Sequence, residues 1–191
     1  DPIRQRQEQS GGITVDNSAA EMHTTLYSIS ESPRDPRVIW VGTDDGNVQL
    51  TRDGGTTWTN VASKLPGVDP GSWVSWVEAS RFDPATAYVA VDRHTFGDMQ
   101  AYVFRTADFG ATWTRIAGPE QGLRGYAHVV KEDSVNSDLL FVGTEFGLWI
   151  SHDRGTNWAQ FKPGNFPAVA VRDIALQTRD HDLVLATHGR G

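Results

Sequence analysis

The sequence predicts an all-β protein built from repeated four-stranded antiparallel units, and three observations support this prediction. An eight-residue motif occurs three times, a short run of β-branched and aromatic residues precedes each copy, and no segment shows the 3.6-residue period of an amphipathic helix. Self-similarity takes precedence over a segment-by-segment assignment, because it defines the unit that the fold repeats.

The motif has the form [ST]-x-D-x-G-x-[TN]-W, and its copies, which we call the repeat turns, span residues 51–58, 106–113 and 151–158. A carboxylate can accept the backbone N–H groups of a tight turn, glycine permits positive φ, and tryptophan fills the space between neighbouring units. We therefore favour a structural role over a catalytic set of three aligned carboxylates. The residues concerned are Asp53, Gly55, Trp58, Asp108, Gly110, Trp113, Asp153, Gly155 and Trp158.

Two apolar runs precede each repeat turn and read as buried strands, with Asp-Pro turns between them at positions 35–36 and 83–84. In the first unit we expect strands at 26–29, 38–43 and 47–51, with a fourth beginning at 57. Four short strands repeated about every 45 residues are typical of β-propeller blades. The predicted fold is a partial β-propeller with blades at 22–65, 72–118 and 124–163, a half-blade at 169–191, and an N-terminal arm or loop at 1–21.

The repeat turns resemble the Asp-box, or bacterial neuraminidase repeat, of sialidases, xyloglucanase-type glycosidases and the sortilin receptor propeller. With Asp44-Asp45-Gly46 and the segment at 187–191, the chain is most similar to bacterial proteins described as sortilin-like or glycosyl-hydrolase-like. This resemblance covers roughly residues 11 to 191. It implies a secreted or periplasmic protein, and an active face opposite the repeat turns, as in sialidase-like propellers.

That opposite face, which we call the loop face, carries an ionisable residue after the second strand of every unit. These residues are Asp44, Asp92, Glu145 and His188. The alternative of simple turn-forming residues is favoured for Asp44 and Glu145 and evenly balanced for Asp92 and His188. Because glycosidases use two carboxylates about 5–9 Å apart, Asp44, Asp92 and Glu145 are the candidate catalytic residues. Asp44 with Asp92 is the pair we would nominate.

An insertion at 93–100 lengthens the loop of the second unit on the same face, and such insertions often carry binding function. Its alternative is a tolerated surface loop. Trp73 and Trp76 either line the site or pack in the core, and core packing is favoured. The candidate ligand-binding residues are Arg93, His94, Asp98, Trp73, Arg124, His188 and Arg190, and Arg172 lies near the same face.

Composition excludes several other functions. A net charge of −7 without a Lys/Arg block argues against nucleic-acid binding, and no apolar run is long enough for a membrane helix. The absence of cysteine excludes disulfides, and no metal-ligand spacing or phosphate-binding loop is present. We expect no metal and no cofactor. The leading hypothesis is a loop face that binds glycan or peptide without catalysis; a glycoside hydrolase segment is the alternative, and an assembly scaffold is a third possibility.

Three and a half blades cannot close into a propeller, because exposed strand edges and unburied blade faces would remain. We therefore expect the remaining blades to come from another polypeptide or from a second copy of this chain, with residues 1–21 as an arm across the seam.

Overall fold

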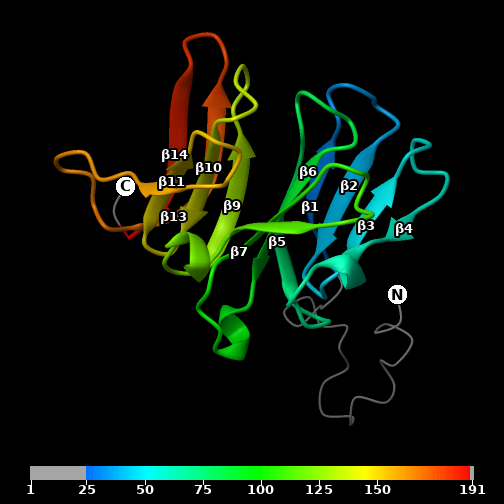
Figure 1. Ribbon diagram of the computed structural model, residues 1–191, viewed down its shortest axis with the longest axis horizontal. Coiled ribbons are helices and arrows are strands. Elements are labelled where there is room, and N and C mark those ends of the chain that lie inside the picture. The colour runs from blue at the N-terminus through cyan, green and yellow to red at the C-terminus, as the bar shows by residue number, and fades with distance from the viewer. Residues whose placement is uncertain (1–24, 190–191) are drawn as a thin grey trace.

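The computed structural model describes residues 25–189, and the prediction of an all-β fold is confirmed over this range (Figure 1). Within residues 25–189 the helices are three short 3₁₀ turns, η2 (Ala62–Lys64), η3 (His94–Phe96) and η4 (Pro119–Gln121). None of the helices between residues 25 and 189 has the length and apolar character needed to cross a membrane. The expected arm at 1–21 and Arg190 lie outside the described residues.

Three four-stranded antiparallel sheets and one two-stranded sheet follow one another along the chain, and each keeps its strands in sequence order. The first sheet contains β1 (Leu26–Glu31), β2 (Ile39–Thr43), β3 (Val48–Thr51) and β4 (Thr59–Asn60). The second contains β5 (Trp73–Ala79), β6 (Ala87–Asp92), β7 (Tyr102–Thr106) and β8 (Thr114–Ala117). The third contains β9 (Ala127–Glu132), β10 (Leu140–Thr144), β11 (Gly147–Ser151) and β12 (Ala159–Gln160). The fourth contains β13 (Ala170–Gln177) and β14 (Asp182–His188).

The first strand of each sheet contacts the first strand of the next, so β1, β5, β9 and β13 lie on the inner side of the assembly. Figure 1 shows the sheets succeeding one another from blue to red around these strands. This is the radial arrangement expected of a partial propeller, and it places the ends of the inner strands around a common axis.

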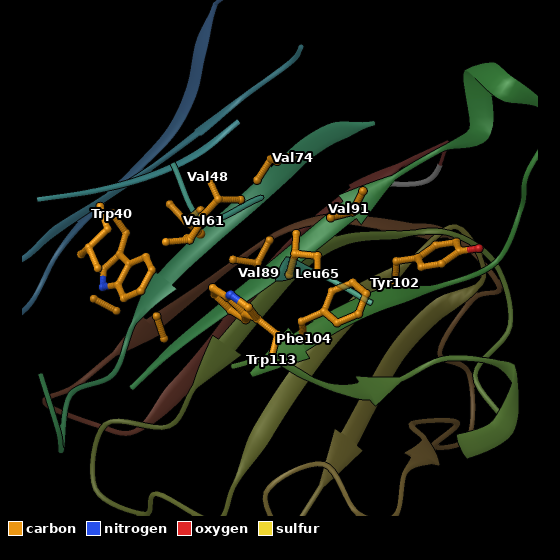
Figure 2. Packing of buried hydrophobic residues seen from close by; sticks show 14 of the residues in the cluster. Trp40, Val48, Val61, Leu65, Val74, Val89, Val91, Tyr102, Phe104 and Trp113 are labelled. Carbon is orange, nitrogen blue, oxygen red and sulfur yellow. The ribbon is translucent and has the colours of Figure 1, made fainter. Parts of the chain in front are cut away.

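The core lies between successive sheets rather than within any one of them. Figure 2 shows Trp40 and Val48 of the first sheet facing Val89, Phe104 and Trp113 of the second. Similar apolar layers separate the second sheet from the third and the third from the fourth. Each sheet therefore depends on its neighbour for burial, as in other repeat folds.

Polar side chains also join neighbouring sheets. The Ser28 and Ser30 hydroxyls of β1 accept the backbone N–H groups of Val77 and Ala79, at 3.0 and 2.9 Å. These bonds link β1 to β5, two strands of different sheets that share no backbone pairing.

The buried carboxylate of Glu132 joins the second and third sheets. It accepts the Ser80 hydroxyl at 2.8 Å, the Arg81 N–H at 2.7 Å and the Tyr88 hydroxyl at 2.9 Å. With these donors the carboxylate is satisfied within the interior.

The repeat turns have the hydrogen bonds predicted for them. In the first, Asp53 accepts the Thr57 N–H at 2.9 Å and the hydroxyls of Thr57 and Thr51 at 2.6 and 2.8 Å. The second and third turns repeat these bonds around Asp108 and Asp153. Because Thr57 belongs to the turn, the fourth strand begins at Thr59, two residues later than expected.

Glycine is required in these turns, since Gly55, Gly110 and Gly155 have φ values of 96°, 73° and 89°. Each turn also bonds to the loop between the first two strands of its own sheet, as Gly54 N–H does to the Arg37 carbonyl at 3.0 Å. The repeat turns therefore lie on the face opposite the loops that follow the second strands.

The role predicted for the turn tryptophans holds for two of the three. Trp113 is 7% exposed and packs in the layer between the first and second sheets, and Trp158 packs partly buried in the next layer. Trp58 is instead 44% exposed, so it does not fill a space between sheets. The physical reason is that no described sheet precedes the first one.

Candidate functional site

The inner strand of every sheet contains one extra residue, a β-bulge, near its loop-face end. The pairing registers skip Tyr27 in β1, Ser75 in β5, His128 in β9 and Arg172 in β13. We call these four residues the bulge row. Bulges re-aim side chains and are common beside binding sites, and all four residues line one hollow of about 250 Å³, the inner hollow.

A second cavity, the outer hollow, adjoins the first and has a volume of about 370 Å³. Tyr27 and Trp73 line both hollows, and their rings meet edge to face at 4.6 Å with an interplanar angle of 89°. Phe96 of η3 and Asp44 also line the outer hollow. Trp73 therefore lines the site instead of packing in the core, and the insertion at 93–100 contributes Phe96 to it.

Asp92, at the end of β6, has a fully buried side chain that holds the start of η3. It accepts the His94 backbone N–H at 2.9 Å and lies 2.6 Å from His94 Nδ1. The His94 ring in turn stacks on Tyr126, with centroids 4.6 Å apart. Within the described residues the second oxygen, Oδ2, has no hydrogen-bond partner, and it lies 3.8 Å from His128 Nδ1.

His128 lies between the carboxylates of Asp92 and Glu145. Its Nε2 is 3.3 Å from Glu145 Oε2, and its Nδ1 is 3.3 Å from Arg172 Nη1. A guanidinium can only donate, so Nδ1 is the acceptor and the proton is on Nε2, where it is donated to Glu145. Arg172 Nη2 reaches the same carboxylate at 3.4 Å.

These contacts set the charge states of the cluster. Burial, together with the Arg172 charge, lowers the pKa of His128, so the imidazole is neutral at neutral pH. Burial raises the pKa of Glu145, but hydrogen bonds from Tyr126 and His128 and the Arg172 charge outweigh it, and the net pKa is lower than usual. Glu145 is consequently an ionised acceptor rather than a proton donor.

The other expected site residues lie outside the cluster of Asp92, His128 and Glu145. Arg93 is bound to Asp69 at 2.6 Å and lies 3.5 Å from Asp98, which accepts the Tyr102 hydroxyl at 2.8 Å. Arg93 and Asp98 thus hold the insertion in place. Asp44 accepts the Thr25 backbone N–H at 2.7 Å.

The expected column of four ionisable residues is only partly assembled. Asp92 and Glu145 are linked through His128, whereas Asp44 lines the separate outer hollow. Arg124 and His188 are exposed and line neither hollow.

Sequence reasoning missed Tyr27, Ser75, Tyr126 and His128. For Tyr27, Ser75 and His128 the only signal is positional: the bulge row occupies equivalent places in the repeat but carries four different residue types. The row can be recognised only when the position of each bulge is known, and no bulge has glycine or proline as its extra residue.

No family model matches the chain. Among curated proteins it is similar to a xyloglucanase from Paenibacillus sp, with 27% identity over 150 residues that make up 69% of this chain and 15% of the relative. Among solved structures it superimposes on the GH74 xyloglucanase from Xanthomonas campestris with a TM-score of 0.66 at 16% identity, covering 85% of this chain and 26% of that one. It also superimposes on YCF48 bound to D1 peptide, with a TM-score of 0.61 at 18% identity over 87% of this chain and 49% of that one.

These structural neighbours are β-propeller proteins, which confirms the predicted fold class. The chain spans about one seventh of the length of the curated xyloglucanase and about a quarter to a half of the solved structures.

Proposed function

We propose that the loop face of this propeller segment binds a glycan chain across the inner and outer hollows. The observation that carries the proposal is the Tyr27–Trp73 pair, which lines both hollows. Aromatic side chains offer an apolar face together with a polar tip, and such a face suits the apolar side of a sugar ring. The similarity to xyloglucanases supports a glycan over other ligands.

The bulge row supplies the polar part of such a site. Arg172 and Glu145 are partly exposed beside the inner hollow and hold fixed donor and acceptor geometry through their contact at 3.4 Å. A largely apolar hollow with a few fixed polar groups is the usual form of a small-molecule site. The repeat turns, as Asp-boxes of the sialidase and sortilin type, would hold the opposite face without contacting the ligand.

Calorimetric titration of the protein with xyloglucan oligosaccharides tests this proposal. We expect saturable binding that Trp73→Ala weakens by at least tenfold. Phe161→Ala is the matched control, because Phe161 belongs to another edge-to-face aromatic pair, with Phe166, outside both hollows. Equal losses in the two variants, or no binding of any glycan, would contradict the proposal.

A peptide ligand is the competing outcome of the same titration, since one structural neighbour is described as bound to a peptide. Binding of acidic and basic test peptides, with no response to oligosaccharides, would replace the glycan by a peptide on this face.

A glycoside hydrolase segment is the second candidate, and the row Asp92–His128–Glu145 favours it. The His128 ring lies between the two carboxylates, with Nδ1 3.8 Å from Asp92 Oδ2 and Nε2 3.3 Å from Glu145 Oε2. This arrangement is compatible with the separation of the two catalytic carboxylates in glycosidases. Because the Asp92 side chain has no exposed surface, binding without hydrolysis is the better supported function. Turnover of chromogenic xyloglucan oligosaccharides that disappears in Asp92→Asn or Glu145→Gln, but persists in Asp44→Asn, would favour the enzyme.

We also propose that further blades cover the outer faces of the first and last sheets, supplied by another polypeptide or a second copy. Leu26 and Ile29 of β1 are 61% and 63% exposed, and Val184 of β14 is 57% exposed. A solution mass above that of one chain is expected. A cooperatively folding monomer without a partner would contradict this part.

A further inference from the structure

A third cavity, the side hollow, lies between the first and second sheets and has a volume of about 210 Å³. It is lined by the β2–β3 turn, by the end of β4 and η2, by the loop that leads into β5, and by β5 and β6 themselves. It adjoins the outer hollow at Gly71 but contains none of the aromatic residues assigned above to glycan binding. A cavity of this size is smaller than the roughly 300–1,000 Å³ of drug-sized sites, so its ligand is small.

One wall of the side hollow forms where the loop before β5 closes over the β2–β3 turn. Gly46, with φ of 89°, lies so near this loop that a Cβ atom would stand 2.8 Å from Gly71 N and 2.9 Å from Ser72 N. Any other residue at this position would push the loop away. The closure is therefore built into the sequence at Gly46.

Asp45, which lines the side hollow, is a buried carboxylate without an ion pair. The residue is 7% exposed, and no cation of residues 25–189 forms a salt bridge with it. Asp69, the other acid of the lining, is already paired with Arg93. Burying an unpaired charge is costly, so a cationic ligand at Asp45 would be stabilised.

The hydrogen bonds of Asp45 with the described residues engage only one of its two carboxylate oxygens. Oδ1 accepts the Thr43 hydroxyl and the Asn47 side-chain N–H, the latter at 2.9 Å. The remaining Asn47 N–H is donated to Thr43 at 3.2 Å. Oδ2 accepts no hydrogen bond from residues 25–189, so it is available to a ligand.

The lining also includes the polar residues Asn60, Ser63 and Ser72, and it has one apolar side. Leu65, Val74 and Val91 are buried, and the partly buried Val68 packs against the same cluster. These side chains suit a short hydrocarbon chain and offer nothing to a second charge.

We propose that the side hollow binds a primary ammonium group on a short aliphatic chain, with the ammonium at Asp45 and the chain against Leu65, Val68 and Val74. A free alkylamine and a lysine side chain share this chemistry. The proposal is independent of glycan binding, because it uses a different cavity.

Titration with n-butylammonium, followed by the backbone amide signals of the side-hollow lining, tests the proposal. We expect saturable shifts at Gly46 and Ser72, and at least tenfold weaker binding of the uncharged isostere 1-butanol. Nα-acetyl-lysine methylamide distinguishes the sources: binding as tight as n-butylammonium indicates a lysine side chain, and much weaker binding indicates a free amine.

Asp45→Asn is the decisive variant, because it removes the charge but keeps an oxygen that can accept the Thr43 and Asn47 hydrogens. We expect it to lose at least tenfold in n-butylammonium affinity, while Glu120→Gln, an equal charge change on η4, loses none. Trp73→Ala should leave amine binding intact even if it abolishes glycan binding, so the two proposals can fail separately.

Val68→Phe provides a second route if Asp45→Asn does not fold, because it fills the cavity and leaves the carboxylate in place. Binding that persists in Val68→Phe would overturn the proposal. So would equal binding of 1-butanol and n-butylammonium, unchanged affinity in Asp45→Asn, or binding of Ca²⁺ that n-butylammonium does not displace.

Discussion

The repeat turns and the bulge row occupy equivalent positions in successive sheets, yet they follow opposite rules. The turns keep the same Asp, Gly and Trp each time, and each turn forms nearly the same hydrogen bonds. The bulge row carries Tyr27, Ser75, His128 and Arg172 at its equivalent places. In this molecule, constancy among repeats marks the groups that build the sheet, and variation marks the groups that line a hollow.

The turns themselves differ in their surroundings. A Cβ atom on Gly110 would stand 3.0 Å from Val61 of the preceding sheet, and one on Gly155 would stand 2.8 Å from Ile116. One on Gly55 would meet only Trp58 of its own turn, at 3.8 Å. The turn carboxylates are therefore bonded within their own turns, whereas the second and third turns depend on the preceding sheet for packing.

The largest effect is expected when the packing of a turn tryptophan is removed. Trp113→Ala should lower the free energy of unfolding by about 3–5 kcal/mol, because Trp113 is buried against Trp40, with ring centroids 5.9 Å apart. Trp58→Ala should cost less than about 1 kcal/mol, since surface positions contribute little. Urea denaturation of both variants measures the difference, and equal losses would show that the turn tryptophans do not differ in packing.

A glycine pair gives the next largest effect. Gly55→Ala and Gly155→Ala both force a side chain into the left-handed region, at about 1–2 kcal/mol each. Gly155→Ala should cost about 1–3 kcal/mol more, because its Cβ overlaps the Ile116 Cβ. Thermal unfolding of the two variants side by side tests this, and a smaller loss for Gly155→Ala would show that the third turn does not pack on the second sheet.

The repeat turns should also make the stability of the fold depend on pH in the acid range. Hydrogen bonds from the Thr112 hydroxyl and N–H and from Thr106 lower the pKa of Asp108 from 3.8 to about 2. A carboxylate with a lowered folded-state pKa stabilises fully above its unfolded pKa and loses this effect as pH falls through the folded value. The Asp108→Asn variant should therefore have a lower melting temperature than the parent protein at pH 7. The difference in melting temperature should disappear as the pH falls from about 4 to about 2. A gap that stays constant down to pH 2 would contradict the assignment.

Tyr27, the exposed residue at the start of the bulge row, should show the smallest effect on stability and the clearest effect on ligand binding. Tyr27→Ala should change the free energy of unfolding by less than about 1 kcal/mol, because the residue is 54% exposed. It should weaken glycan binding about tenfold, since it removes half of the aromatic pair. Chemical denaturation and calorimetric titration of one preparation measure both quantities. A large stability loss with unchanged affinity would make Tyr27 a structural residue.

The fold was predictable from sequence because its determinants are local. The bonds of a repeat turn join residues two to four positions apart, and they need only Asp, Gly and a hydroxyl or amide at fixed spacing. The site was less predictable because it depends on where one extra residue falls in an inner strand. His128 was therefore overlooked, although Glu145 and Asp92 on either side of it were named.

The structure also changed the meaning of several predicted residues. Arg93 and Asp98 were expected to contact ligand because they lie on an insertion, but they pair within it. Composition alone cannot separate a loop that binds from the residues that hold the loop, because both are polar and close in sequence. Phe96 of the same insertion lines the outer hollow.

The contacts of Glu132 have a consequence for the lifetime of the fold. Its partners Ser80, Arg81 and Tyr88 lie 44 to 52 residues away along the chain, whereas the bonds of a repeat turn close loops of a few residues. Short loops close at small entropic cost, so the turns form early, and the carboxylate finds its donors only after two sheets have docked. An interaction made after the barrier slows unfolding and leaves the folding rate almost unchanged. We therefore expect Glu132 to slow the separation of the second and third sheets.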